Sequence, residues 1–162
     1  DVDYRVVPFD DIMPSVKSGE YDVGVIIHEG QLTWKDEGVN LVLDLGIWWN
    51  EKTGLPLPLG GNVVRKDLGL EMCGKITKDV RNSIEHSLSN PEEALEFAKE
   101  WGRGIDDETN EEFVGMYVNK RTLDYGNDGR EAIRLFLRKG QEIGMVRSDL
   151  DVNSIVFVGS GE

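Results

Sequence analysis

The stretch DVGVIIHEGQ, Asp22–Gln31, is the part of the sequence that most strongly indicates a fold. Its run Val23–His28 is apolar up to the last residue, as in a strand that a parallel sheet covers on both faces. The run ends abruptly in His28 and Glu29, and Gly30 lets the chain turn away sharply. Ligands bind at the carboxyl ends of strands in open α/β sheets, so His28 is expected where a binding crevice forms.

Two interpretations of His28 follow from the residues alone. Imidazole exchanges protons readily near neutral pH, so this side chain is a candidate general acid or base. The alternative is a structural histidine that forms a hydrogen bond at the sheet edge. In an extended strand Glu29 points away from His28, where it either orients a neighbour or faces solvent.

Short helices and further strands alternate in the first part of the chain, up to about residue 67. Acidic residues that cap a helix, and glycines that end one, mark the helices. The alternation indicates an α/β fold class. The other predicted strands are Tyr4–Val7, Leu41–Leu45 and Asn62–Arg65, and the predicted helices are one from Asp10 or Asp11 to about Lys17, one over Gln31–Glu37, and one that contains Trp48 and Trp49 and ends at Gly54.

From about residue 68 the sequence is typical of helices. Apolar residues recur at i, i+4 spacing from Ile76 to Leu88, which predicts one amphipathic helix over Glu71–Leu88. Asn90 and Pro91 mark the start of the next helix. The remaining predicted helices run from Pro91 to about Trp101, from Asp106 or Asp107 to about Val118, and from Asn127 or Asp128 to Gly144.

Composition excludes several classes of protein. The chain has 162 residues, of which 39% are hydrophobic and 30% charged, as in one folded domain. Its net charge of −13 argues against nucleic acid as a partner, because phosphate binding requires basic patches. No apolar run approaches the ~18–20 residues that span a bilayer. The single cysteine, Cys73, excludes an internal disulfide framework and suits a reducing compartment.

Other chemical candidates are weaker. HEGQL lacks the second histidine of the H-E-x-x-H zinc motif, and His86 lies far along the sequence, so no metal site is predicted. Cys73 is interpreted as a packed small residue, and no G-x-S-x-G nucleophile is present. LGG at Leu59–Gly61 either presents backbone N–H groups to an anion or forms a crossover between two parts of the fold.

Three aromatic residues are candidates for either the core or a cleft. Trp48 and Trp49 are adjacent on a predicted helix, so one is expected in the core and the other partly exposed. Tyr117, in the segment MYVN, either reaches a cleft or packs in the interior.

Three segments, in this order and spacing, together resemble the 1,4-dihydroxy-6-naphthoate synthases of the futalosine route to menaquinone. They are FDDIMPSVKSGEYDVGVIIHEGQLTW, LVLDLGIWWNEKTGLPLPLGGNVVRKDL and MYVN, and the resemblance extends from about Tyr4 to Gly144. IIHEGQ and TGLPLPLGG are its most specific parts. The chorismate dehydratases of the same pathway share the scaffold but are not expected to carry the histidine segment.

The resemblance implies a fold like the type II periplasmic solute-binding proteins, in which two α/β lobes joined by a hinge enclose the ligand. Residues 1–67 would form most of the second lobe, incomplete at its start, together with the return across the hinge. Residues 68–162 would form a C-terminal helical segment that packs toward the first lobe, which is expected to precede Asp1.

The resemblance also implies an activity. The family converts cyclic de-hypoxanthine futalosine to 1,4-dihydroxy-6-naphthoate, with loss of a three-carbon fragment and no cofactor. His28 matches the family's proposed catalytic base, and Gly60 and Gly61 would line the substrate cleft at the hinge. A cytoplasmic lyase with a small-molecule substrate, and with neither a membrane nor a nucleic-acid partner, is therefore expected; a homo-oligomer is possible.

Two rival classes remain open. The scaffold also suits a non-catalytic solute-binding or sensor domain, since fold alone does not determine function. The chain could also be an inactive fragment, because half a cleft should not turn over substrate. The runner-up substrate is another carboxylated bicyclic or futalosine-like compound.

Overall fold

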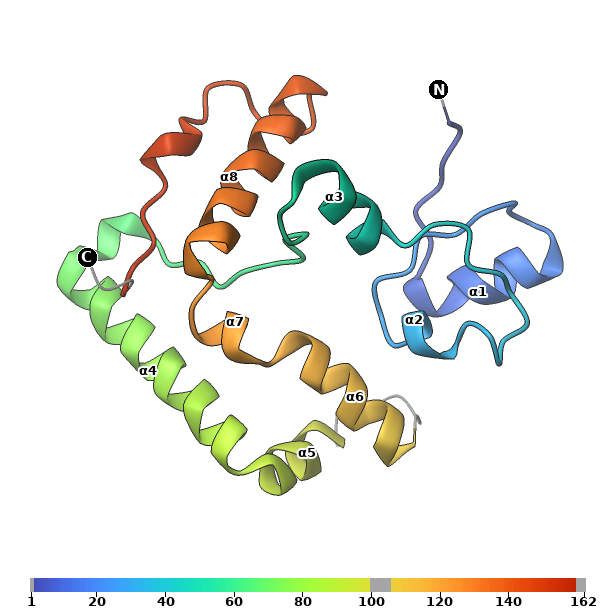
Figure 1. Ribbon diagram of the computed structural model, residues 1–162, viewed down its shortest axis with the longest axis horizontal. Coiled ribbons are helices and arrows are strands. Elements are labelled where there is room, and N and C mark those ends of the chain that lie inside the picture. Colours follow the sequence, from blue (N-terminus) through green and yellow to red (C-terminus); the bar gives the residue numbers. More distant parts are fainter. Residues whose placement is uncertain (1, 100–105, 160–162) are drawn as a thin grey trace.

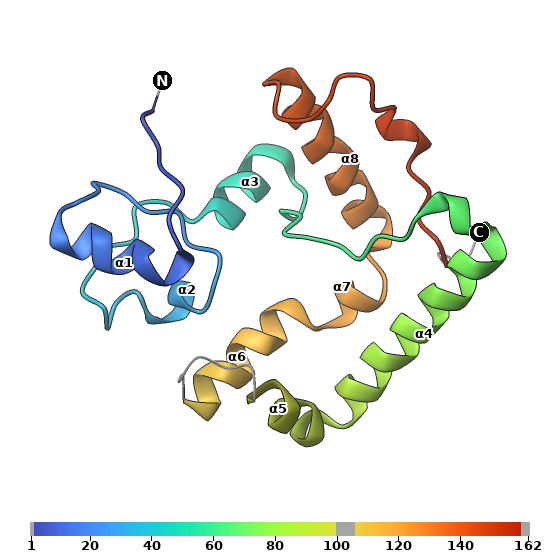
Figure 2. The same cartoon turned by 180° about the vertical axis from the view of Figure 1, so that it is seen from behind.

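The computed structural model describes residues 2–99 and 106–159, and within them the chain forms helices, turns and irregular segments (Figures 1 and 2). The first part carries three α-helices and one 3-10 helix, α1 Phe9–Ser18, α2 Gly30–Thr33, α3 Leu45–Thr53 and η1 Lys66–Leu68. The second part carries α4 Leu70–Ser89, α5 Pro91–Lys99, α6 Asp107–Tyr117, α7 Lys120–Leu123, α8 Gly126–Glu142 and the 3-10 helix η2 Val152–Ser154.

The expected α/β fold class, with its periplasmic-binding-protein type II-like lobe, is wrong for the described residues. No strand occurs in residues 2–99 or 106–159. The segments predicted as Tyr4–Val7, Val23–His28 and Asn62–Arg65 are irregular chain, and Leu45, at the end of the other predicted strand, begins α3.

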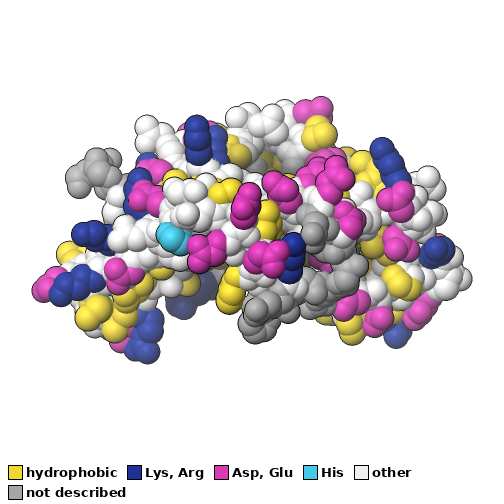
Figure 3. All heavy atoms as spheres, turned by 90° about the horizontal axis from the view of Figure 1, so that it is seen from below, with side chains coloured by type: hydrophobic (Ala, Val, Ile, Leu, Met, Phe, Trp, Pro, Cys, Tyr) yellow, Lys and Arg dark blue, Asp and Glu magenta, His cyan; other side chains and the backbone are white. Residues whose placement is uncertain are grey.

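The predicted strands are absent from the described residues for a physical reason. An apolar pattern indicates that a segment tends to be buried, but it does not provide the second strand with which the segment must pair. A strand exists only where a second segment completes its backbone hydrogen bonds, and these segments do not pair with one another. Their side chains stay exposed, at 91% for Val6, 65% for Val25 and 97% for Val63. Apolar patches therefore share the surface with many acidic side chains on the face drawn in Figure 3.

The stop residues predicted for the first helices are confirmed, whereas the predicted cap of the first helix is wrong: Asp10 and Asp11 lie in the first turn of α1, and Pro8 precedes it without a side-chain cap. Gly19 and Gly54 follow α1 and α3 with φ of 80° and 70°, a left-handed conformation that glycine adopts at little cost. The Asp44 side chain accepts a hydrogen bond from the Ile47 N–H at 2.9 Å and so caps α3. The expected end of α5 near Trp101 lies outside the described residues.

The helices form an open arrangement. In both views α1 and α2 lie together at one end and α4 runs along the other, with α3 between the first group and α8 (Figures 1 and 2). The short helix α7 was not predicted from the sequence. Asn119 and Thr122 form a capping box at its start, in which the Asn119 side chain accepts from the Arg121 N–H at 2.9 Å.

The buried apolar residues of the described chain are few: Trp49, Cys73, Ala132 and Val152. Trp49 is 7% exposed, its indole N–H donates to the Pro56 carbonyl at 3.1 Å, and its ring meets Phe136 edge to face at 5.6 Å between centroids. The neighbouring Trp48 is 42% exposed. The expectation that one tryptophan is core and the other partly exposed is confirmed.

Among the described residues, none of the helices combines the length and apolarity that crossing a bilayer requires.

Replacement of the two tryptophans by alanine should have unequal effects. Trp49→Ala removes a buried ring from a small core and should lower the free energy of unfolding by about 3–5 kcal/mol. Trp48→Ala, the matched control, should cost about 1 kcal/mol or less, because much of that ring is already in water. Denaturant titration followed by circular dichroism measures both. Equal losses would contradict the assignment of Trp49 to the core.

Candidate functional site

His28 lies in the turn that leads into α2, and its ring is held from two sides. The Gly30 N–H donates to Nδ1 at 3.0 Å, and the Phe9 ring lies 5.3 Å away between centroids. The side chain is 13% exposed. A Cβ on Gly30 would lie 2.6 Å from Cε1 of His28, so only glycine allows the backbone to approach the imidazole this closely.

The hydrogen bond from Gly30 determines which ring nitrogen carries the proton. Because Nδ1 accepts, the neutral imidazole of His28 holds its proton on Nε2. Within the described part of the chain Nε2 is buried and has no hydrogen-bond partner. An unpaired buried donor costs about 1–3 kcal/mol, a cost that a ligand oxygen placed at Nε2 would remove.

Glu29 lies beside His28 rather than on the opposite face. Its carboxylate Oε2 is 3.8 Å from Nδ1 of His28. The expectation of opposite directions assumed an extended chain, whereas Glu29 has φ −54° and ψ −20°, a helical conformation. The carboxylate is therefore placed to pair with the imidazole whenever the ring is protonated.

Tyr117, the last residue of α6, connects this turn to the helical part of the chain. Its hydroxyl donates to the Ile27 carbonyl at 2.9 Å and accepts from the Gln31 side-chain amide at 3.0 Å. Its ring packs against Phe113 at 4.9 Å between centroids. From the sequence, Tyr117 was expected either to reach a cleft or to pack in the interior. In the structure its hydroxyl joins the end of α6 to Ile27 and Gln31, which lie 90 and 86 residues earlier in the chain.

A cavity of about 460 Å³ lies between residues 56–62 and the segment from the end of α6 to α8. Gly60, Gly61 and Tyr117 all line it. A Cβ on Gly61 would lie 2.8 Å from the Tyr125 hydroxyl, so the glycine allows this ring to reach the loop. His28 is not among the lining residues, and Tyr117 is what joins its turn to the cavity.

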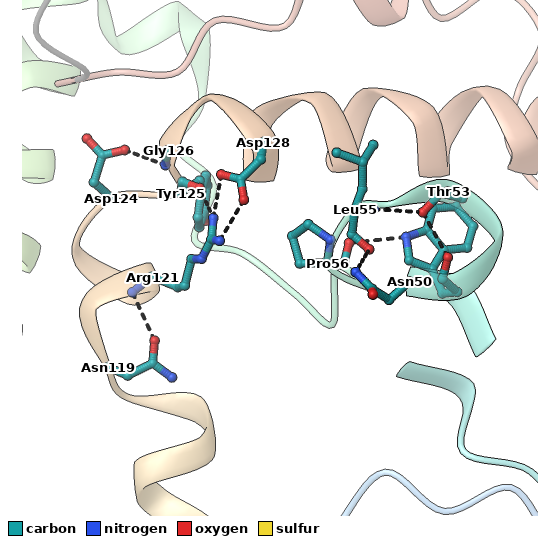
Figure 4. Close-up of polar contacts among 11 residues, drawn as sticks. Asn50, Thr53, Leu55, Pro56, Asn119, Arg121, Asp124, Tyr125, Gly126 and Asp128 are labelled. Carbon is teal, nitrogen blue, oxygen red and sulfur yellow. Dashed lines mark hydrogen bonds and ion pairs between the residues drawn. The ribbon is translucent and has the colours of Figure 1, made fainter. Parts of the chain in front are cut away.

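The loop that carries Gly60 and Gly61 leaves α3 through a hydrogen-bonded turn (Figure 4). The Leu55 N–H donates to the Thr53 hydroxyl at 3.1 Å, and the Asn50 side chain donates to the Leu55 carbonyl at 3.3 Å. Together with the bond from Trp49 to Pro56, these contacts determine where the loop enters the cavity wall.

The opposite wall is held by a bidentate ion pair, which sequence patterns did not predict. The Arg121 guanidinium donates to both carboxylate oxygens of Asp128 at 2.6 Å and to the Tyr125 carbonyl at 2.8 Å (Figure 4). This contact lowers the pKa of Asp128 from 3.8 to about 2. The Asn-x-x-Thr capping box at the start of α7 is the one sequence signal that could have located this wall.

The other titratable candidates lie apart from this site. Cys73 is buried, and its thiol lies 3.5 Å from the Arg65 carbonyl, so it packs as a small residue. The side chain of His86 is 67% exposed on α4. In the part of the chain that the structure describes, no three His, Cys, Asp or Glu side chains are grouped as metal ligands would be.

Acid should remove the stabilising effect of Asp128. Its pKa is lowered in the folded protein, so its contribution is present above about pH 4 and is lost as the pH falls through about 2. The stability difference between the wild type and Asp128→Asn should therefore be largest near neutral pH and shrink over that interval. Thermal melts at several pH values measure it, with Asp79→Asn on α4 as the control for loss of charge. A difference independent of pH would contradict the role assigned to the ion pair.

Comparison with known proteins shows similarity to enzymes of one pathway. The family model described as menaquinone biosynthesis matches residues 1–142. The chain is 43% identical over 131 residues to the 1,4-dihydroxy-6-naphtoate synthase of Thermus thermophilus, covering 80% of this chain and 48% of that enzyme. It is 36% identical over 141 residues to the enzyme of the same name from Streptomyces coelicolor, covering 87% and 50%.

A solved structure is also similar. The crystal structure of an Archaeoglobus fulgidus protein aligns with a TM-score of 0.82 at 39% identity, covering 86% of this chain and 53% of that one. The chain thus spans about half the length of the relatives that it matches.

Proposed function

Because this chain belongs to the menaquinone biosynthesis family, we propose that it acts as a 1,4-dihydroxy-6-naphthoate synthase, a lyase that acts on cyclic de-hypoxanthine futalosine. The single observation that carries the proposal is the imidazole of His28, which is held by Gly30 while its Nε2 has no partner among the described residues. A buried polar group without a partner calls for an explanation, and a catalytic role is one that fits an imidazole in this turn.

His28 is the proposed general base. In the neutral ring the lone pair lies on Nδ1, so Nδ1 is the atom that takes the proton from the substrate carbon, once the Gly30 N–H has given way. The electron pair left on carbon forms a new C=C bond of the ring as the adjacent C–C bond breaks, and the bicycle becomes aromatic. The Glu29 carboxylate, 3.8 Å from Nδ1, then pairs with the imidazolium. The three-carbon fragment leaves with the pair of the broken bond and takes the proton back from the His28 imidazolium, which restores the neutral ring.

Gly60 and Gly61 are the proposed substrate-binding residues. They line the cavity, in which apolar side chains such as Met116 and Ile133 offer a surface for a flat ring system. Glycine backbone N–H groups suit a carboxylate, because no side chain prevents its approach. Tyr125, whose hydroxyl lies close to Gly61, is a further polar contact for the same ligand.

The proposal requires no cofactor, because proton transfer and C–C cleavage need only an acid–base group and a site that excludes water. A soluble small-molecule substrate and a net charge of −13 are consistent with a cytoplasmic enzyme that engages neither membranes nor nucleic acid. The exposed apolar side chains of the irregular segments favour association with further polypeptide, including a second copy of the chain.

A non-catalytic binding domain is the second candidate function. It is favoured by the tautomer of His28, since a ring that presents an N–H at Nε2 is suited to hold a ligand oxygen. The two functions differ in what His28 contributes, and one pair of variants separates them.

His28→Ala should lower kcat by a factor of about 100 to 10,000 while the dissociation constant for the substrate changes little, because a general base contributes to the transition state. His86→Ala is the matched control, since the chain has only two histidines and this one is exposed on α4. Turnover of cyclic de-hypoxanthine futalosine and calorimetric titration measure the two quantities. A wild type that binds the compound without turning it over, and whose affinity falls in His28→Ala, would favour the binding domain; a wild type with neither turnover nor binding would refute both.

A further inference from the structure

We propose that the Tyr117 hydroxyl is a positioning group for His28, holding the turn that carries the imidazole and linking it to the cavity at Gly60 and Gly61. The catalytic importance of this contact rests on the proposed function, whereas the hydrogen bonds themselves do not depend on it. Tyr117 does not touch the imidazole in any described contact; it acts through the backbone and side chain of the residues on either side.

The two hydrogen bonds of the hydroxyl bracket His28. One ends on the carbonyl of Ile27, immediately before the histidine, and the other comes from the Gln31 amide, three residues after it. Between these points the His28 carbonyl accepts from the Gln31 N–H at 3.0 Å, and the Gly30 N–H donates to Nδ1. Fixing both ends of the turn therefore fixes the donor that sets the orientation and tautomer of the ring.

Local packing on the α1 side comes from Phe9, whose ring lies 5.3 Å from the His28 ring between centroids, and the Tyr117 hydroxyl supports the turn from the α6 side. The helix α2 has four residues, and the chain before it is irregular. Ile27 is 71% exposed, so its side chain adds little burial to hold the turn. Hydrogen bonds between segments far apart in the sequence contribute most to local stability where few apolar contacts hold those segments together.

Tyr117 is itself anchored on the cavity side. Its carbonyl accepts from the Thr122 hydroxyl at 2.7 Å, and this hydroxyl accepts from the Asn119 N–H at 3.1 Å. The capping box of α7 thereby fixes the end of α6. Because Tyr117 also lines the cavity, a ligand that lies against Gly60 and Gly61 can contact the same side chain that holds the His28 turn.

The test uses the ¹⁵N-labelled chain and two readouts that need no turnover: hydrogen exchange of the Gly30 amide and the ¹⁵N shifts of the His28 ring. Tyr117→Phe keeps the aromatic ring and removes both hydrogen bonds. We expect the Gly30 amide to exchange about fivefold faster or more, which corresponds to one hydrogen bond of about 1 kcal/mol. The His28 shifts should move from the Nε2–H tautomer toward the average of both tautomers. Tyr4→Phe, at a site 74% exposed, is the matched control and should change neither readout.

Gln31→Met is the second variant, because it removes only the bond donated to Tyr117 and preserves side-chain length. It should change the same two readouts in the same direction by a smaller amount, with amide exchange in α8 unaffected. Unchanged Gly30 exchange and unchanged His28 shifts in both variants would overturn the proposal. A His28→Ala protein with full turnover would refute the proposed function and leave this structural role standing.

Discussion

The candidate site depends on one hydroxyl group, that of Tyr117. It forms hydrogen bonds with Ile27 and Gln31, which lie 90 and 86 residues earlier in the chain. It brings together the segments IIHEGQ and MYVN, and the cavity beside it is lined by LPLPLGG. The three stretches on which the family resemblance rests therefore meet around a single side chain. These two bonds hold the His28 turn to the end of α6, while the Phe9 ring of α1 packs against the imidazole from the other side.

At His28 the contacts of the two ring nitrogens differ. Nδ1 is satisfied by the Gly30 N–H and lies near Glu29, whereas Nε2 is buried without a partner in the described chain. This asymmetry permits two chemical roles: proton uptake at Nδ1 with Glu29 as counter-ion, and hydrogen-bond donation at Nε2. Donation at Nε2 depends on the close backbone approach that only a glycine at position 30 allows, whereas proton uptake at Nδ1 requires that contact to open.

The sequence predicted the helices well because their signals are local. Gly19 and Gly54, the predicted stop residues, end their helices through contacts within a few residues. Asp44, which caps α3, was placed in a predicted strand and was missed. The prediction of strands was wrong for the opposite reason. Val23–His28 has the composition of a strand, but a strand must pair with a second segment, and no local pattern encodes that partner. Gly60 and Gly61 lie in a cavity wall, and their role in binding substrate stays a prediction. The ion pair of Arg121 with Asp128 arises only once α7 and α8 are placed.

Nuclear Overhauser spectroscopy on the labelled chain tests the central contact most directly. Cross-peaks are expected between the ring protons of Tyr117 and the side-chain amide protons of Gln31, since the Tyr117 oxygen lies 3.0 Å from the Gln31 nitrogen. The Phe113–Tyr117 ring contact within α6 supplies the internal reference. If the reference cross-peaks appear and those to Gln31 are absent, the His28 turn is not held by Tyr117, and the account of the site is contradicted.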